Sequence, residues 1–217
     1  MNHQIPRRRR LFEILMVVAT GIGKIFVMDV FNLKLPFIIT SIVFWASYYL
    51  YRTKKNNSLK EYWGLSILDS KDLFKIVTIL GIIVILGIVI FGVYIKPIKW
   101  SVHVFFVLLV YPIWGLIQQF LVMSLFAGNI KDLSIKYIGN KLIIVLTSIM
   151  FSIVHYPSMN LMIATFLMAL IYSTLFLRYR NIIPLGLFHG VIGGLFYYVI
   201  LNRDAWVEFV TVNGWDF

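Results

Sequence analysis

The chain has 217 residues, of which 60% are hydrophobic and only 13% are charged. A soluble domain of this size cannot bury so large an apolar fraction, so the composition excludes a soluble globular protein and indicates a polytopic membrane protein. The net charge of +11 does not indicate a nucleic-acid partner, because the basic residues gather in short segments between apolar runs. The absence of cysteine excludes disulfides and thiol chemistry.

Seven apolar runs are each near the roughly 20 residues that cross about 30 Å of hydrocarbon. They predict an all-α fold, a polytopic transmembrane helix bundle of about seven spans. The spans cover about residues 11–31, 35–51, 74–95, 102–127, 142–155, 161–177 and 182–201. Four arginines precede the first run, as in a signal peptide. However, the run contains charged residues and no small-residue cleavage site follows, which favours an uncleaved first helix.

Basic residues in the loops predict the orientation of the chain. With the N-terminus inside, the inner segments hold 14 lysine and arginine residues and the outer segments hold four. This bias favours a cytoplasmic N-terminus in a prokaryotic plasma membrane. We divide the chain into a basic cytoplasmic tail (1–10), N-terminal transmembrane helices with an inner loop (11–100), a core (101–201) and an interfacial C-terminal tail (202–217).

Two surface segments are predicted to lie at the membrane interface. The inner loop, residues 52–72, interleaves apolar and charged side chains, which is typical of an amphipathic segment on the inner membrane surface. The C-terminal tail carries four aromatic residues suited to the interface: Trp206, Phe209, Trp215 and Phe217.

Three charged residues fall in the first span. We expect Glu13 near the inner interface and Asp29 near the outer one, with Lys24 extending outward to reach water. The alternative is a functional pair of Lys24 with Asp29 that faces the other helices. His103, at the start of the fourth span, is expected to be interfacial and not part of a site.

Gln118 and Gln119 lie inside the apolar run of the fourth span. An unpaired amide in hydrocarbon costs roughly 4–8 kcal/mol, so both side chains should face protein or trapped water. Two later runs carry one histidine each, His155 and His189. The glycines around His189 allow close helix contact and should place its face against neighbouring helices: Gly186, Gly190, Gly193 and Gly194. We interpret the two glutamines and two histidines as one buried site.

These segments, taken in order, resemble the CAAX-prenyl-protease and bacteriocin-processing (CPBP, or Abi) family of intramembrane proteases. That family shows Glu-Glu-x-x-x-Arg in one span, Phe-x-x-x-His in the next and His-x-x-x-Asn in a later one. The similar segments here are Gln118–Met123, Phe151–His155 and His189–Gly193, and the resemblance covers about residues 101–201. It implies a CPBP-type core in which a glutamate, helped by a histidine, activates water. The later histidine and asparagine would stabilise the oxyanion.

The sequence departs from the family pattern at four motif positions. Glutamine replaces both glutamates, methionine replaces the arginine and glycine replaces the asparagine, at Gln118, Gln119, Met123 and Gly193. A carboxamide cannot take a proton from water near neutral pH. Glu13 or Asp29 could supply the missing base only if the first span packs at the site. Two histidines are fewer than the three protein ligands of most catalytic zinc sites, so neither a metal nor a cofactor is expected.

Three functions follow as alternatives. The first is a degenerate family member that binds a membrane-associated peptide or protein without cleaving it. The second is an active but divergent endopeptidase that uses His155 and His189 to cleave membrane-associated or prenylated peptides. The third is a small transporter or immunity-type membrane protein. The expected partners are the lipid bilayer and a membrane-associated peptide or protein, with no nucleic acid, and the oligomeric state is left open.

Overall fold

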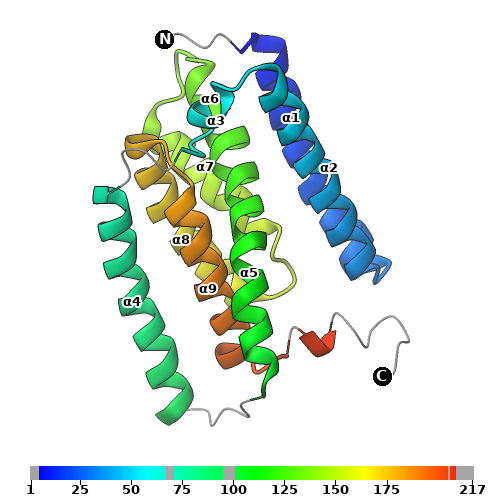
Figure 1. Ribbon diagram of the computed structural model, residues 1–217, viewed down its shortest axis with the longest axis vertical. Helices are drawn as coiled ribbons and strands as arrows, with labels where there is room; N and C mark the ends of the chain where they lie inside the picture. The colour runs from blue at the N-terminus through cyan, green and yellow to red at the C-terminus, as the bar shows by residue number, and fades with distance from the viewer. Residues whose placement is uncertain (1–4, 67–70, 95–100, 205, 209–217) are drawn as a thin grey trace. The chain divides into compact units, whose positions relative to one another are not determined.

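We describe a computed structural model of the chain, which places residues 5–66, 71–94, 101–204 and 206–208. Over these residues the protein is all-α, with no strand, and the predicted fold class is confirmed (Figure 1). The helices are α1 (Arg7–Gly23), η1 (Lys24–Val30), α2 (Lys34–Lys55), α3 (Leu59–Tyr62), α4 (Lys71–Tyr94), α5 (His103–Gln119), η2 (Phe120–Gly128), α6 (Asn129–Asp132), α7 (Asn140–Ile153), α8 (Met159–Tyr179), α9 (Ile183–Leu195) and η3 (Phe196–Ile200).

Among the described residues, five continuous helices are long and apolar enough to cross a membrane: Arg7–Val30, Lys71–Tyr94, His103–Asp132, Met159–Tyr179 and Ile183–Ile200. The protein is therefore an integral membrane protein. Two predicted spans differ from these five. Helix α2 has 22 residues, but its tyrosines, serines and threonines make it less apolar. Helix α7 has 14 residues and extends only about 21 Å, short of a full crossing.

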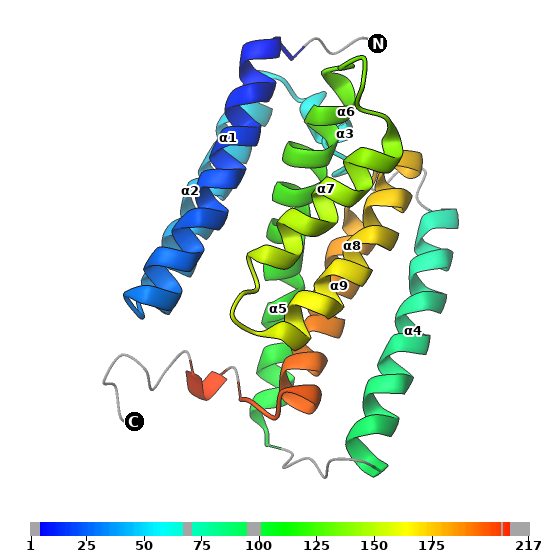
Figure 2. The ribbon, with the colours of Figure 1, turned by 180° about the vertical axis from the view of Figure 1, so that it is seen from behind.

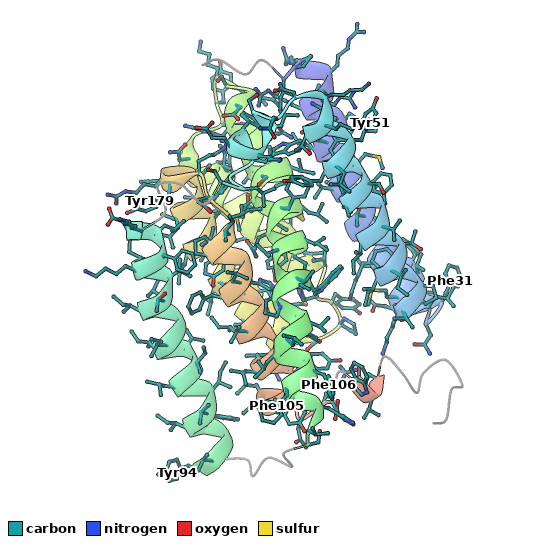
Figure 3. The ribbon with its side chains drawn as sticks, in the orientation of Figure 1. Phe31, Tyr51, Tyr94, Phe105, Phe106 and Tyr179 are labelled. Atoms are coloured by element: carbon teal, nitrogen blue, oxygen red, sulfur yellow. The ribbon has the colours of Figure 1, made fainter. Side chains whose placement is uncertain are left out.

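Exposed aromatic side chains lie near the helix ends. Phe31 and Tyr51 mark the two ends of the α1–α2 pair, and Tyr94 lies at the end of α4 (Figure 3). Tyrosine rings, which combine an apolar body with a polar hydroxyl, favour the boundary between lipid and water. Their positions fit helices whose middle parts lie in hydrocarbon.

The chain divides into two compact units. Unit 1 comprises residues 1–68 and 119–182, and unit 2 comprises residues 69–118 and 183–217. In unit 1, α1 and α2 run side by side, and α7 packs along α8 (Figure 2). In unit 2, α9 packs against both α4 and α5, and a small core forms around Ile88, Leu195 and Val199. The division falls between Gln118 and Gln119.

Three of the membrane helices contain wide π-helical stretches, η1, η2 and η3. In such a stretch each amide bonds five residues back, and single turns of this kind are frequent at functional sites. The predicted spans assumed uniform α-helix, so these stretches were not foreseen. The stretch η2 begins directly after Gln119, inside the segment that resembles the glutamate motif.

The inner loop differs from its prediction. Its apolar side chains Leu59 and Trp63 are buried within the protein, so α3 packs against other helices of unit 1. The carbonyl of Gly64 accepts a hydrogen bond from the amide of Ile182 at 2.9 Å. Residues 67–70 of this loop, and Phe209, Trp215 and Phe217 of the predicted interfacial tail, lie outside the described residues.

Candidate functional site

The glutamine pair lies at the junction of α5 and η2. Gln119 is completely buried and Gln118 is half-buried, as the cost of exposing an amide to hydrocarbon predicts. Met123, at the position where the family motif has arginine, is also completely buried. The segment therefore presents neutral side chains where the motif would place a carboxylate and a guanidinium group.

His155 lies in a turn two residues after the end of α7, whereas the predicted span ended at His155 itself. Its Nδ1 lies 2.7 Å from the carbonyl oxygen of Phe151, one helical turn earlier. The Phe151 ring meets the imidazole edge-on, with 5.0 Å between ring centroids. A carbonyl only accepts, so Nδ1 carries the proton in this contact and Nε2 of the neutral ring keeps its lone pair. The Phe-x-x-x-His spacing thus fixes both the orientation and the tautomer of His155.

Lys24 and Asp29 form a salt bridge of 2.7 Å within η1. Lys24 also donates a 3.0 Å hydrogen bond to the carbonyl of Tyr156, the residue after His155. The Lys24–Asp29 pair of the alternative is therefore observed as a salt bridge, and a function for it stays a prediction. The pair forms because the π-helical turn brings the i and i+5 side chains together. It fastens η1 to the turn that carries His155.

His189 is buried in α9, on a helix whose glycines meet α5 at backbone distance. A Cβ added to Gly190 would lie 2.3 Å from Pro112 Cα, and one added to Gly186 would lie 2.7 Å from Leu116 Cα. The predicted close helix contact is confirmed for these two glycines. Gly193 makes no such contact, and its nearest neighbour is the His189 ring at 3.9 Å. The motif asparagine would stand at this position beside the imidazole.

The four predicted site residues are divided between the units. Gln119 and His155 belong to unit 1, whereas Gln118 and His189 belong to unit 2. A single site built from all four remains a prediction.

Glu13 lies in a polar cluster that is buried within the protein, and its depth near the inner interface stays a prediction. It is 1% exposed, accepts a 2.7 Å hydrogen bond from Asn129 Nδ2 and is 3.4 Å from Arg52. The Tyr48 hydroxyl also donates to it. Asn129 is ten residues after Gln119 in one continuous helix, so Glu13 lies about 15 Å away along the helix axis. Glu13 therefore does not replace the missing motif glutamates.

Asp132 organises a second ionic cluster, which sequence reasoning had placed only in an inner loop. It lies 3.1 Å from Arg10 and 2.6 Å from Arg180, and accepts a hydrogen bond from Tyr62. Burial, reinforced by the Asp132 carboxylate, raises the pKa of Tyr62 to about 12, so the phenol stays protonated and donates. The sequence feature that could have indicated this cluster is the isolated position of Asp132 among basic segments.

His103 joins the start of α5 to the segment after η3. Its Nδ1 lies 2.8 Å from Asp204 Oδ2, and Ser101 Oγ donates to the same oxygen at 3.3 Å. The other oxygen of Asp204 accepts from the amides of Trp206 and Val207. These contacts join the start of α5 to the segment after η3, so His103 has a structural role, and its exclusion from the site stays a prediction.

The part of the chain that holds the three motif segments matches a known protein family. Residues 99–195 match the family model described as type II CAAX prenyl endopeptidase Rce1-like. The chain carries an Rce1-like domain of the CPBP family. Searches of curated proteins and of solved structures find no significant match.

All three motif segments lie inside the Rce1-like domain. The substitutions at Gln118, Gln119, Met123 and Gly193 therefore fall within the matched region and not outside it. Asp132 is the single carboxylate of the domain. Among the described residues, no three histidines or acidic side chains are placed to hold a metal ion.

Proposed function

We propose that the Rce1-like domain binds a membrane-associated peptide or protein and does not hydrolyse it. The observation that carries this proposal is the position of Asp132, the only carboxylate between residues 99 and 195. Its oxygens accept from Arg10, Arg180 and Tyr62. It is also 13 residues beyond Gln119 in the same helix, about 20 Å along the axis. The domain therefore lacks a carboxylate that can serve as general base at the glutamine pair.

Two carboxylates outside the domain are also engaged. Glu13 is held by Asn129, Tyr48 and Arg52 at the far end of the same continuous helix. Asp29 is paired with Lys24. Recruiting either one as a base would require breaking a buried or half-buried ion pair, which is costly.

The retained polar groups suit recognition of a peptide backbone. Gln118 carries an amide donor and acceptor on a half-buried side chain, and His155 keeps a lone pair on Nε2. In a low-dielectric environment such groups bind exposed peptide N–H and C=O groups strongly, because the alternative is an unpaired polar group. The family description points to a prenylated C-terminal peptide as the first ligand to test.

The proposal is tested with purified full-length protein in detergent and a panel of prenylated and unprenylated C-terminal CAAX peptides. We expect saturable binding of a peptide and no cleavage product. The matched variant restores the motif with Gln118→Glu, Gln119→Glu, Met123→Arg and Gly193→Asn, and is expected to gain hydrolysis. Cleavage by the unmodified protein, lost in both His155→Ala and His189→Ala, would overturn the proposal.

The alternative is a divergent endopeptidase in which His155 acts as the base. The Nδ1 contact to the Phe151 carbonyl favours it, because it orients Nε2 and leaves that atom able to accept a proton. This alternative predicts cleavage by the unmodified protein that rises with pH as the imidazole loses its proton. Hydrolysis that persists in His155→Ala would exclude it.

A further inference from the structure

Basic side chains gather where α1 begins and α2 ends, and one of them contacts Tyr51. Lys55 Nζ lies 2.6 Å from the Tyr51 hydroxyl and 4.4 Å from the centre of its ring. Arg52 lies in the last turn of α2 beside Tyr51 in the sequence, and Arg9 lies in the first turn of α1. We name this group, Arg9, Arg52, Lys55 and Tyr51, the α1–α2 cationic end.

The cationic end carries more positive charge than its own contacts neutralise. Arg52 is paired with Glu13 at 3.4 Å. Arg9 and Lys55 form no salt bridge with a carboxylate in the part of the chain that the structure describes, and both are exposed. The cluster at Asp132 differs, because there Arg10 and Arg180 share one carboxylate. The cationic end therefore has two positive charges available for an external anion.

Exposed apolar side chains continue from the cationic end along both helices. The Arg9 guanidinium lies 5.9 Å from the centre of the Phe12 ring, and Phe12 is half-exposed. Leu15 on α1 is 66% exposed and Leu50 on α2 is 63% exposed. Charge, aromatic ring and aliphatic surface thus follow one another along the α1–α2 pair, with Tyr51 labelled near its charged end (Figure 3).

We infer that the α1–α2 cationic end binds the phosphate headgroup of an anionic phospholipid. Arg9 and Lys55 donate to the phosphate oxygens, and the acyl chains lie along the exposed apolar surface of α1 and α2. Basic side chains recognise phosphate by charge-assisted hydrogen bonds. The adjoining apolar surface favours a lipid over soluble phosphate, because a free ion gains nothing from it.

The variant that tests this site is Arg9→Gln with Lys55→Gln. Arg52 is left in place, since its loss would strand the buried Glu13 carboxylate. Lys136→Gln is the matched control: Lys136 also lies over a tyrosine ring, 5.6 Å from that of Tyr137, and is exposed. A charge-conserving variant, Arg9→Lys with Lys55→Arg, separates loss of charge from a folding defect.

Binding is measured on full-length protein in nonionic detergent by native mass spectrometry, with dioleoylphosphatidylglycerol and dioleoylphosphatidylcholine as probes. We expect preferential retention of phosphatidylglycerol. The double glutamine variant should bind it about 30-fold more weakly, from about 1 kcal/mol for each basic residue at an anionic surface and 1.4 kcal/mol per tenfold. The control and the charge-conserving variant should stay within about threefold of the unmodified protein.

Several results would overturn the inference. They are equal retention of the two lipids, unchanged binding by the double glutamine variant, or an equal loss in the Lys136→Gln control. Millimolar inorganic phosphate that displaces the lipid completely would assign the site to a soluble anion. None of these outcomes bears on peptide binding or hydrolysis by the Rce1-like domain.

Discussion

Replacing Gly190 with alanine tests whether backbone contact between α5 and α9 holds unit 2 together. The new Cβ would lie 2.3 Å from Pro112 Cα and 2.4 Å from the Tyr111 carbonyl oxygen, whereas ordinary contact begins at 3.4 Å. Both neighbours are backbone atoms, so no side-chain rotation relieves the overlap. The helices must separate by about 1 Å, and overpacking of this kind costs about 3 kcal/mol. The expected fall in melting temperature is about 6–12 °C.

Gly193→Ala is the matched control, three residues along the same helix. Its Cβ would meet only the His189 ring, at an ordinary 3.9 Å. Alanine stabilises a helix interior by about 0.5–1 kcal/mol relative to glycine, so this variant should melt at the same temperature or slightly higher. Thermal unfolding of both proteins, purified in one detergent, provides the comparison. Equal melting temperatures for the two variants would refute the assignment of Gly190 to a helix–helix contact.

Three further predictions concern the buried cluster, the chain end and the orientation. Asn129→Leu removes the 2.7 Å donor to buried Glu13 and should destabilise the protein by about 2–3 kcal/mol in thermal unfolding, whereas an unchanged melting temperature would contradict the cluster. Burial alone would raise the pKa of Asp204, but hydrogen bonds from His103 and the Val207 amide hold it below its ordinary value. The folded state therefore favours the charged carboxylate of Asp204, which stabilises the protein fully above about pH 4. This stabilisation is lost as the pH falls through the lower pKa of the folded state, and Asp204→Asn should abolish that pH dependence. Because the chain has no cysteine, Arg8→Cys and Asn32→Cys are single labelling sites, and an impermeant thiol reagent added to intact cells should modify only Asn32→Cys if the N-terminus is cytoplasmic.

Composition and local pattern were sufficient for much of the fold. Long apolar runs must form helices in hydrocarbon because every backbone polar group has to bond internally, and the glycines of α9 predicted a close crossing that Gly186 and Gly190 make. The cost of exposing an amide also predicted that Gln119 is buried. These properties depend on each segment and its solvent, and not on which distant segment packs beside it.

The ionic contacts were not predictable in the same way. Glu13 is paired with residues 39 and 116 positions away, and Asp132 with residues 122 and 48 positions away, so no local spacing indicates them. The Lys24–Asp29 pair was only the less favoured alternative, because the i+5 spacing is unfavourable in an α-helix but suits the π-helical η1. Whether Gln118, Gln119, His155 and His189 form one site depends on packing between segments, which their sequence positions do not determine.

The interleaving of the two units has a consequence for biosynthesis. A nascent chain that has emerged through residue 182 contains every segment of unit 1 but only the first part of unit 2. Helices α4 and α5 are therefore synthesised before α9, and until α9 is made the surface around Gly115 lacks its packing partner. Because lipid provides no hydrophobic force between helices, the late arrival of α9 completes this unit through direct backbone packing. The order of translation thus allows unit 1 to fold first. His189 is synthesised after Gln118, Gln119 and His155.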